Sequence, residues 1–80
     1  MEIKILGGGC ANCRALEAMA KKAVADLGIP ATVEEVTDYA AIASYGVMRT
    51  PALVIDGTVF LSGRVPDQDE VRRIIEGLAR

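Results

Sequence analysis

The sequence predicts an α/β fold with the element order β-α-β-α-β-β-α, in which a four-stranded mixed sheet is flanked by three helices. One observation behind this prediction is that two short segments with apolar alternation enclose a longer segment with helical periodicity. Another is that two apolar runs flank a turn dipeptide later in the chain, ahead of a final amphipathic segment. With 80 residues the chain has the length of one domain, which we place at residues 1–80.

The first part of the chain predicts a strand and a long helix. Residues 2–6, EIKIL, alternate polar and apolar side chains, the pattern of a half-buried strand. Across residues 11–27 the apolar positions recur every three or four residues, as in an amphipathic helix whose stripe comprises Leu16, Met19, Ala20, Ala23, Val24 and Leu27. Gly28 supplies the left-handed residue that ends many helices, and Pro30 prevents the helix from resuming.

A second strand and a short helix follow. Residues 31–36, ATVEEV, have an imperfect apolar alternation, which suits a strand at the edge of the sheet. Thr37 or Asp38 can cap a short helix over residues 39–45, which Gly46 ends. We expect the aromatic side chains to pack in or beside the core: Tyr39, Tyr45 and Phe60.

The C-terminal part predicts a hairpin and a helix. The runs ALVI (52–55) and TVFL (58–61) flank an Asp-Gly dipeptide at 56–57, which suits a type I′ turn. Asp67 is placed to cap a last helix that extends to Ala79 and whose buried face comprises Val71, Ile74, Ile75 and Leu78. Because a helix joins the first two strands, they should be parallel, whereas the hairpin adds antiparallel strands. Helices must then cover both faces of the sheet.

The composition excludes several kinds of partner. Nine Lys and Arg against eleven Asp and Glu give a net charge of −2, so no basic surplus exists to bind nucleic acid. No stretch approaches the ~20 apolar residues that a membrane-spanning helix needs, so we expect no membrane partner. The N-terminal segment MEIKILGGG has too short an apolar part for a signal peptide. We therefore expect a protein of the cytoplasm, a compartment in which thiols are usually kept reduced. We also expect a monomer.

The segment GGGCANC contains the only two cysteines, Cys10 and Cys13, at the predicted junction between the first strand and the first helix. If Cys10 occupies the N-cap position, the amides of Asn12 and Cys13 point toward its sulfur. The positive end of the helix dipole also favours an anion there. Both effects favour the thiolate, which is the reactive form of cysteine.

The spacing makes Cys13 a suitable partner for Cys10. Residues three apart in a helix have Cα atoms roughly 5 Å apart, within the ~4.4–6.8 Å range of a disulfide. Cys10 can therefore attack a partner's disulfide, and Cys13 can release the mixed disulfide by attacking Cys10. A bridge that closes so small a loop would stabilise the fold little. The preceding glycines either keep the sulfur accessible to a partner chain or simply provide a loop with positive φ angles.

Together these features resemble the thioredoxin fold, and most of all the small single-domain thioredoxin- or glutaredoxin-like redox-active disulfide proteins. The resemblance spans the whole chain and depends on the strand–GGGCANC–helix segment, on RTPALVIDG and on SGRVP before the last helix. It implies a minimal thioredoxin fold and a thiol–disulfide oxidoreductase with Cys10 as the nucleophile and Cys13 as the resolving thiol. It also implies that Pro51 is cis beside the cysteines and that the backbone near Thr50 pairs with an extended substrate segment.

The resemblance extends to the contacts and partners of the site. The substrate-binding positions that it implies are Gly9, Ala11, Asn12, Thr50 and Pro51. The partners that it implies are protein disulfides and a reductase or other electron donor. We expect no bound cofactor besides the redox-active disulfide itself.

The chain departs from the larger members of that family at several points. Asn12 stands where they have proline, so one more amide can reach the Cys10 sulfur. Their buried acid has no counterpart in EIKIL, because Ile3 and Ile5 occupy the face that we expect to be buried. The glutathione-binding charges of glutaredoxins are not recognisable, so glutathione dependence is not expected.

Two other functions would use the same cysteine pair. A metal-binding module would hold a soft ion such as Cu(I) between the two thiolates. Small metallochaperones with C-x-x-C run β-α-β-β-α-β, however, whereas this chain is predicted to end on a helix. A non-catalytic redox sensor needs the same reactive dithiol as an enzyme and stays open as an alternative. Because the chain has no histidine, a Cys/His zinc site within it is excluded.

Overall fold

The computed structural model describes residues 1–7 and 10–79. Over these residues the chain forms β1 (Glu2–Leu6), α1 (Ala11–Leu27), β2 (Thr32–Val36), α2 (Tyr39–Ser44), β3 (Ala52–Ile55), β4 (Thr58–Ser62) and α3 (Gln68–Leu78). This order confirms the predicted α/β fold, and the element bounds lie close to those that the periodicity predicts. In the described part of the chain, no helix combines the length and the apolar character needed to cross a membrane.

The strands form one mixed sheet in the order β2-β1-β3-β4. β1 lies inside the sheet, parallel to β2 and antiparallel to β3, and β3 is antiparallel to β4. β2 is therefore an edge strand, as its imperfect alternation predicts. The turn between β3 and β4 has positive φ angles at both Asp56 (49°) and Gly57 (84°), which a type I′ turn requires.

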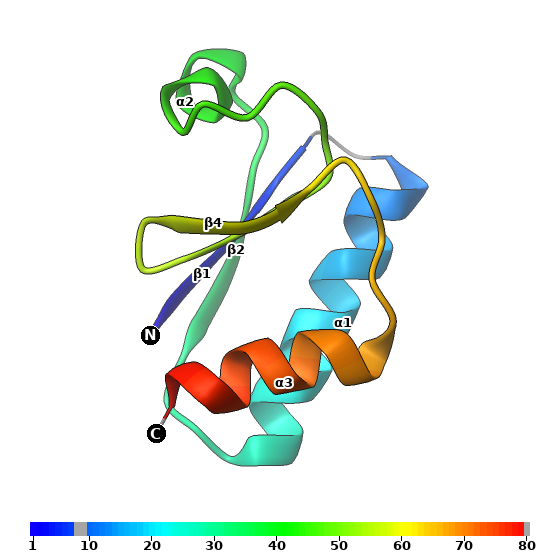
Figure 1. The fold of residues 1–80 in the computed structure, drawn as a ribbon, viewed down its shortest axis with the longest axis vertical. Coiled ribbons are helices and arrows are strands. Elements are labelled where there is room, and N and C mark those ends of the chain that lie inside the picture. The colour runs from blue at the N-terminus through cyan, green and yellow to red at the C-terminus, as the bar shows by residue number, and fades with distance from the viewer. Residues whose placement is uncertain (8–9, 80) are drawn as a thin grey trace.

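Two helices cover one face of the sheet. α1 and α3 pack against each other on this face (Figure 1). The core between them and the sheet comprises Ile3, Ile5, Leu16, Ala20, Ala23, Leu53, Ile55, Leu61, Val71 and Ile75. Burying one Leu or Ile side chain contributes roughly 1.5–3 kcal/mol, so this layer holds α1 firmly against β1. The position of the first turn of α1 follows from this packing.

The opposite face carries a smaller core, which α2 covers. Because side chains alternate along a strand, Leu6 of β1 and Val54 of β3 point to this face. They pack there with Ala52 and with Ile42 of α2. Figure 1 shows α2 on the other side of the strands from α1 and α3. Helices therefore cover both faces, as predicted.

The start of α3 is fixed by side chains. Oδ1 of Asp67 accepts a hydrogen bond from the Glu70 amide at 2.8 Å, which makes Asp67 the N-cap. Arg64 Nη1 donates to Glu70 Oε1 at 2.9 Å, and this hydrogen bond holds the pKa of Glu70 below its ordinary value. Gln68 Nε2 donates to the carbonyl oxygen of Met19 at 2.9 Å and so ties the start of α3 to α1.

Replacing this cap tests how much the last helix depends on it. We expect Asp67→Ala to lower the free energy of unfolding by about 1 kcal/mol, because the Glu70 amide loses its acceptor. Denaturant unfolding monitored by circular dichroism measures the change. The control is Asp69→Ala, which removes a carboxylate from the same turn without removing the N-cap. Equal losses in the two variants would contradict the capping role of Asp67.

Candidate active site

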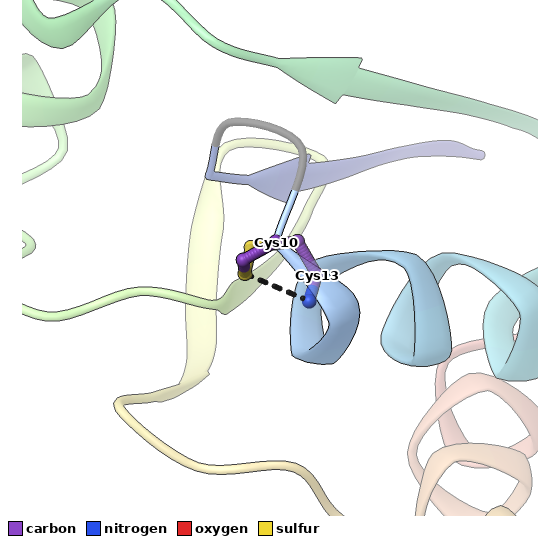
Figure 2. Close-up of a disulfide and its surroundings, with 2 residues drawn as sticks. All are labelled: Cys10 and Cys13. Carbon is purple, nitrogen blue, oxygen red and sulfur yellow. Dashed lines mark hydrogen bonds between the residues drawn. A yellow bond between two sulfur atoms is a disulfide. The ribbon is translucent and has the colours of Figure 1, made fainter.

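Cys10 is the N-cap residue of α1. Its backbone is extended, with φ −82° and ψ 159°, and its carbonyl oxygen accepts from the Arg14 amide at 3.0 Å. Its Sγ accepts a hydrogen bond from the Cys13 amide at 3.1 Å, the dashed line in Figure 2. The sulfur thus takes the place of the side-chain oxygen that usually caps a helix. This confirms the predicted cap and the predicted Cys13 donor, whereas a bond from the Asn12 amide stays a prediction.

The two cysteines form a disulfide, so the structure is that of the oxidised chain. Their Cα atoms are 5.2 Å apart, close to the separation expected for positions three apart in a helix. The two residues differ sharply in exposure, because Cys10 is exposed whereas Cys13 is only 1% exposed. A large partner can therefore reach Cys10 but not Cys13.

A second segment, immediately before β3, borders the same site. The Thr50–Pro51 peptide bond is cis, the isomer that the resemblance implies. Pro51 is buried and Thr50 is exposed. The carbonyl oxygen of Pro51 accepts from the Gly63 amide at 2.9 Å, which ties this segment to the end of β4.

Cys10 and Thr50 meet at one cleft of about 270 Å³, lined by Gly7, Cys10, Thr37, Tyr39, Ile42 and Thr50. The cleft thus brings together the end of β1, the start of α1, the segment around α2 and the segment before β3. None of its lining residues carries a charged side chain. Any substrate segment that enters it would meet backbone groups, hydroxyls and apolar surface.

The remaining positions predicted to bind substrate lie in different surroundings. Ala11 and Asn12 are exposed on the first turn of α1, directly after Cys10 in the sequence. Gly9 lies outside the described residues. Apart from Cys10 and Thr50, the residues that line the cleft were not predicted as site residues: Gly7, Thr37, Tyr39 and Ile42.

Tyr39 corrects one expectation from the sequence. We expected it to pack in or beside the core, but the residue is 88% exposed and lines the cleft. It is the first residue of α2, directly after the N-cap Asp38, and a helix of six residues buries only one face. The sequence did carry a sign of this exposure, because Tyr39 stands at the start of a predicted helix that is too short to bury more than one face.

Charged groups are absent from the interior near the cysteines. No polar or charged side chain of the described residues is buried, so no buried carboxylate lies beneath Cys13. Within residues 1–7 and 10–79, no cluster of three or more His, Cys, Asp or Glu side chains could hold a metal ion. For chemistry, the described residues offer a cysteine pair in which Cys10 is exposed and Cys13 is buried, an arrangement that suits thiol–disulfide exchange.

Comparison with known proteins agrees with this geometry. A family model described as a thioredoxin domain matches residues 1–76. A thioredoxin of Methanothermobacter thermautotrophicus is 40% identical over 75 residues, covering 94% of this chain and 97% of that protein. A thioredoxin of Methanocaldococcus jannaschii is 37% identical over 70 residues, covering 88% and 80% of the two chains. The chain therefore belongs to the thioredoxin family and is a thioredoxin-like thiol–disulfide oxidoreductase.

Proposed function

We propose that this oxidoreductase exchanges its cysteine pair with disulfides of protein substrates, with Cys10 as the nucleophile and Cys13 as the resolving thiol. The observation that carries this assignment is the contrast between the two sulfurs. Cys10 is exposed, and its sulfur accepts a hydrogen bond from the Cys13 amide at the N-terminus of α1. Cys13, in contrast, is buried. Both the donor and the helix dipole favour a thiolate at Cys10 when the pair is reduced.

In the first step, the Cys10 thiolate attacks one sulfur of the substrate disulfide. A bond forms between Cys10 Sγ and that sulfur, the substrate S–S bond breaks, and the other substrate sulfur leaves as a thiolate that takes a proton. The Cys13 amide favours this step because its hydrogen bond to Cys10 Sγ stabilises the attacking thiolate. The product is a mixed disulfide between protein and substrate.

In the second step, Cys13 loses its proton and attacks Cys10 Sγ. The Cys10–Cys13 bond forms, the mixed disulfide breaks, and the second substrate sulfur leaves as a thiolate. Two electrons have then passed from the protein dithiol to the substrate disulfide. A Cys10–Cys13 disulfide is the product expected of this step, and the Cα separation of 5.2 Å in the structure is compatible with it.

Substrate binding is assigned to the neutral cleft beside Cys10. We place an extended substrate segment along the backbone at Thr50, an exposed residue that lines the cleft, where main-chain hydrogen bonds would supply affinity. The first turn of α1, with Ala11 and Asn12, borders the attacked sulfur, and Gly9 and Pro51 complete the proposed set. The absence of charge in the cleft favours substrates selected by backbone shape over substrates selected by charge.

The proposed partners are protein disulfides on one side and a separate reductase or other electron donor on the other. The protein would act in the cytoplasm and as a monomer. It would need no bound cofactor, because the two sulfurs themselves carry the electrons. The Cu(I) alternative is disfavoured by the element order, because α2 lies between β2 and β3, where the order β-α-β-β-α-β has no helix.

Serine variants of the two cysteines test the roles directly. We expect both Cys10→Ser and Cys13→Ser to abolish reduction of insulin disulfides, because each step needs its own thiol. Cys13→Ser should additionally accumulate a mixed disulfide through Cys10, which non-reducing electrophoresis and mass spectrometry detect. Turnover in the Cys10 variant would contradict the assignment. So would a wild type that is inactive with every donor while it binds Cu(I) tightly.

A proline substitution tests the amides that face the Cys10 sulfur. Asn12→Pro removes one main-chain donor at the start of α1, so we expect the pKa of the Cys10 thiol to rise by about one unit. Ultraviolet absorbance of the thiolate as a function of pH measures it. The control is Ala11→Pro, because proline is well tolerated at the first helical position and the donors of residues 12 and 13 remain. An unchanged pKa in Asn12→Pro would remove Asn12 from the account.

A further inference from the structure

Gly7 lies between the end of β1 and the cysteines and has an unusual environment. Its amide donates to the carbonyl oxygen of Val36 at 2.9 Å, so the residue continues the pairing of β1 with β2. It is buried and has a φ of +141°, a conformation that residues with side chains rarely adopt. It also lines the cleft beside Cys10.

The space next to Gly7 is filled by the sulfur of Cys13. A Cβ atom built on Gly7 would lie 2.5 Å from Cys13 Sγ and 3.2 Å from Thr50 Cβ. Non-bonded carbon atoms reach their optimal separation at about 3.5–4.0 Å, so a methyl group at Gly7 would require the larger sulfur atom to move by roughly 1 Å. Cys13 is 1% exposed and bonded to Cys10, so its sulfur has little room to move.

We propose that Gly7 is a positioning residue for the second step of the exchange. Its missing side chain leaves the space from which Cys13 Sγ bonds to Cys10 Sγ. This inference rests on the proposed roles of the two cysteines and adds a residue that acts on only one of them. Gly7 takes no part in bond making, because it acts through the position of the Cys13 sulfur.

The two steps should therefore respond differently to a side chain at Gly7. The first step uses the sulfur of Cys10 and the amide of Cys13, and neither is among the three atoms nearest to a Cβ on Gly7. The second step needs the sulfur of Cys13 at bonding distance from Cys10. A misplacement of about 1 Å in a reacting atom can slow a step by up to about a hundredfold.

The test is a single turnover of reduced Gly7→Ala with a disulfide-bonded peptide. We expect release of reduced peptide from the mixed disulfide to slow about ten- to a hundredfold. Formation of the mixed disulfide should slow far less, because there the added methyl acts only through its approach to Thr50 in the cleft. Acid quenching followed by mass spectrometry counts free protein, mixed disulfide and oxidised protein over time. The control for an added side chain without a contact is Gly28→Ala, which also has a positive φ (63°) but no neighbour within 4 Å of the added Cβ. Release at the wild-type rate in Gly7→Ala would overturn the inference and leave the proposed function intact.

A second measurement separates the sulfur contact from backbone strain at Gly7. The cost of Gly7→Ala in free energy of unfolding is compared in the wild type and in a Cys13→Ala background, which lacks the sulfur. A smaller cost in the Cys13→Ala background supports the inference, as does a Gly7→Ala protein that folds only in that background. Equal costs, or failure to fold in both backgrounds, would overturn it, because the glycine would then act through its φ angle alone.

Failure of the proposed function has a different signature. Cys13→Ser with the native Gly7 should trap the same mixed disulfide. If it traps none, the nucleophilic role of Cys10 fails, and the inference about Gly7 fails with it.

Discussion

The hydrogen bond from the Cys13 amide to the Cys10 sulfur is the interaction on which the site depends. It does two things at once, because it caps α1 and places a main-chain donor against the atom that must carry negative charge. An oxygen-bearing cap residue would satisfy the helix equally well but would supply no thiolate. The site thus uses an ordinary requirement of helix ends to activate a nucleophile.

The rest of the fold holds that helix end in place. β1 lies inside the sheet and leads into the cysteine segment, while Leu16 and Ala20 of α1 are buried against the core that includes Ile3 and Ile5. The elements on either side of Cys10 in the sequence, β1 and α1, thus both contribute residues to this core. The segment before β3 is held in turn by the bond from the Gly63 amide to the carbonyl oxygen of Pro51. The sulfur of Cys10 and the backbone before β3 therefore border one cleft, each next to an element that is packed in the core.

Most of the fold could be predicted from the sequence because periodicity and helix ends agree. Gly28, for example, has the predicted left-handed conformation, with a φ of 63°, and closes α1. Asp38, one of two residues proposed to cap the short helix, is its N-cap. The pairing between β3 and β4 shifts register between Leu53 and Val54, and no local pattern in the sequence indicates such a shift.

The site could be predicted only in part, for a physical reason. The spacing of Cys10 and Cys13 and the start of α1 are local, so the cap and the disulfide geometry follow from the sequence. The cleft depends on residues that the fold brings together from distant segments, such as Thr37, and periodicity does not reveal them. The glycine-rich stretch allowed two interpretations, and the φ of +141° at Gly7 agrees with a loop that needs positive φ angles, while access of a partner chain to the Cys10 sulfur stays a prediction. The close approach of Cys13 Sγ to Gly7 was not predicted.

The most direct test of the account is the acidity of the Cys10 thiol in the reduced wild-type protein. The rate of Cys10 alkylation by iodoacetamide as a function of pH reports the pKa, and mass spectrometry identifies which cysteine has reacted. A sulfur at a capped helix end should titrate at least about one unit below the ~8.5 of an ordinary cysteine. A pKa equal to that of the same cysteine in a short unfolded peptide would contradict the account.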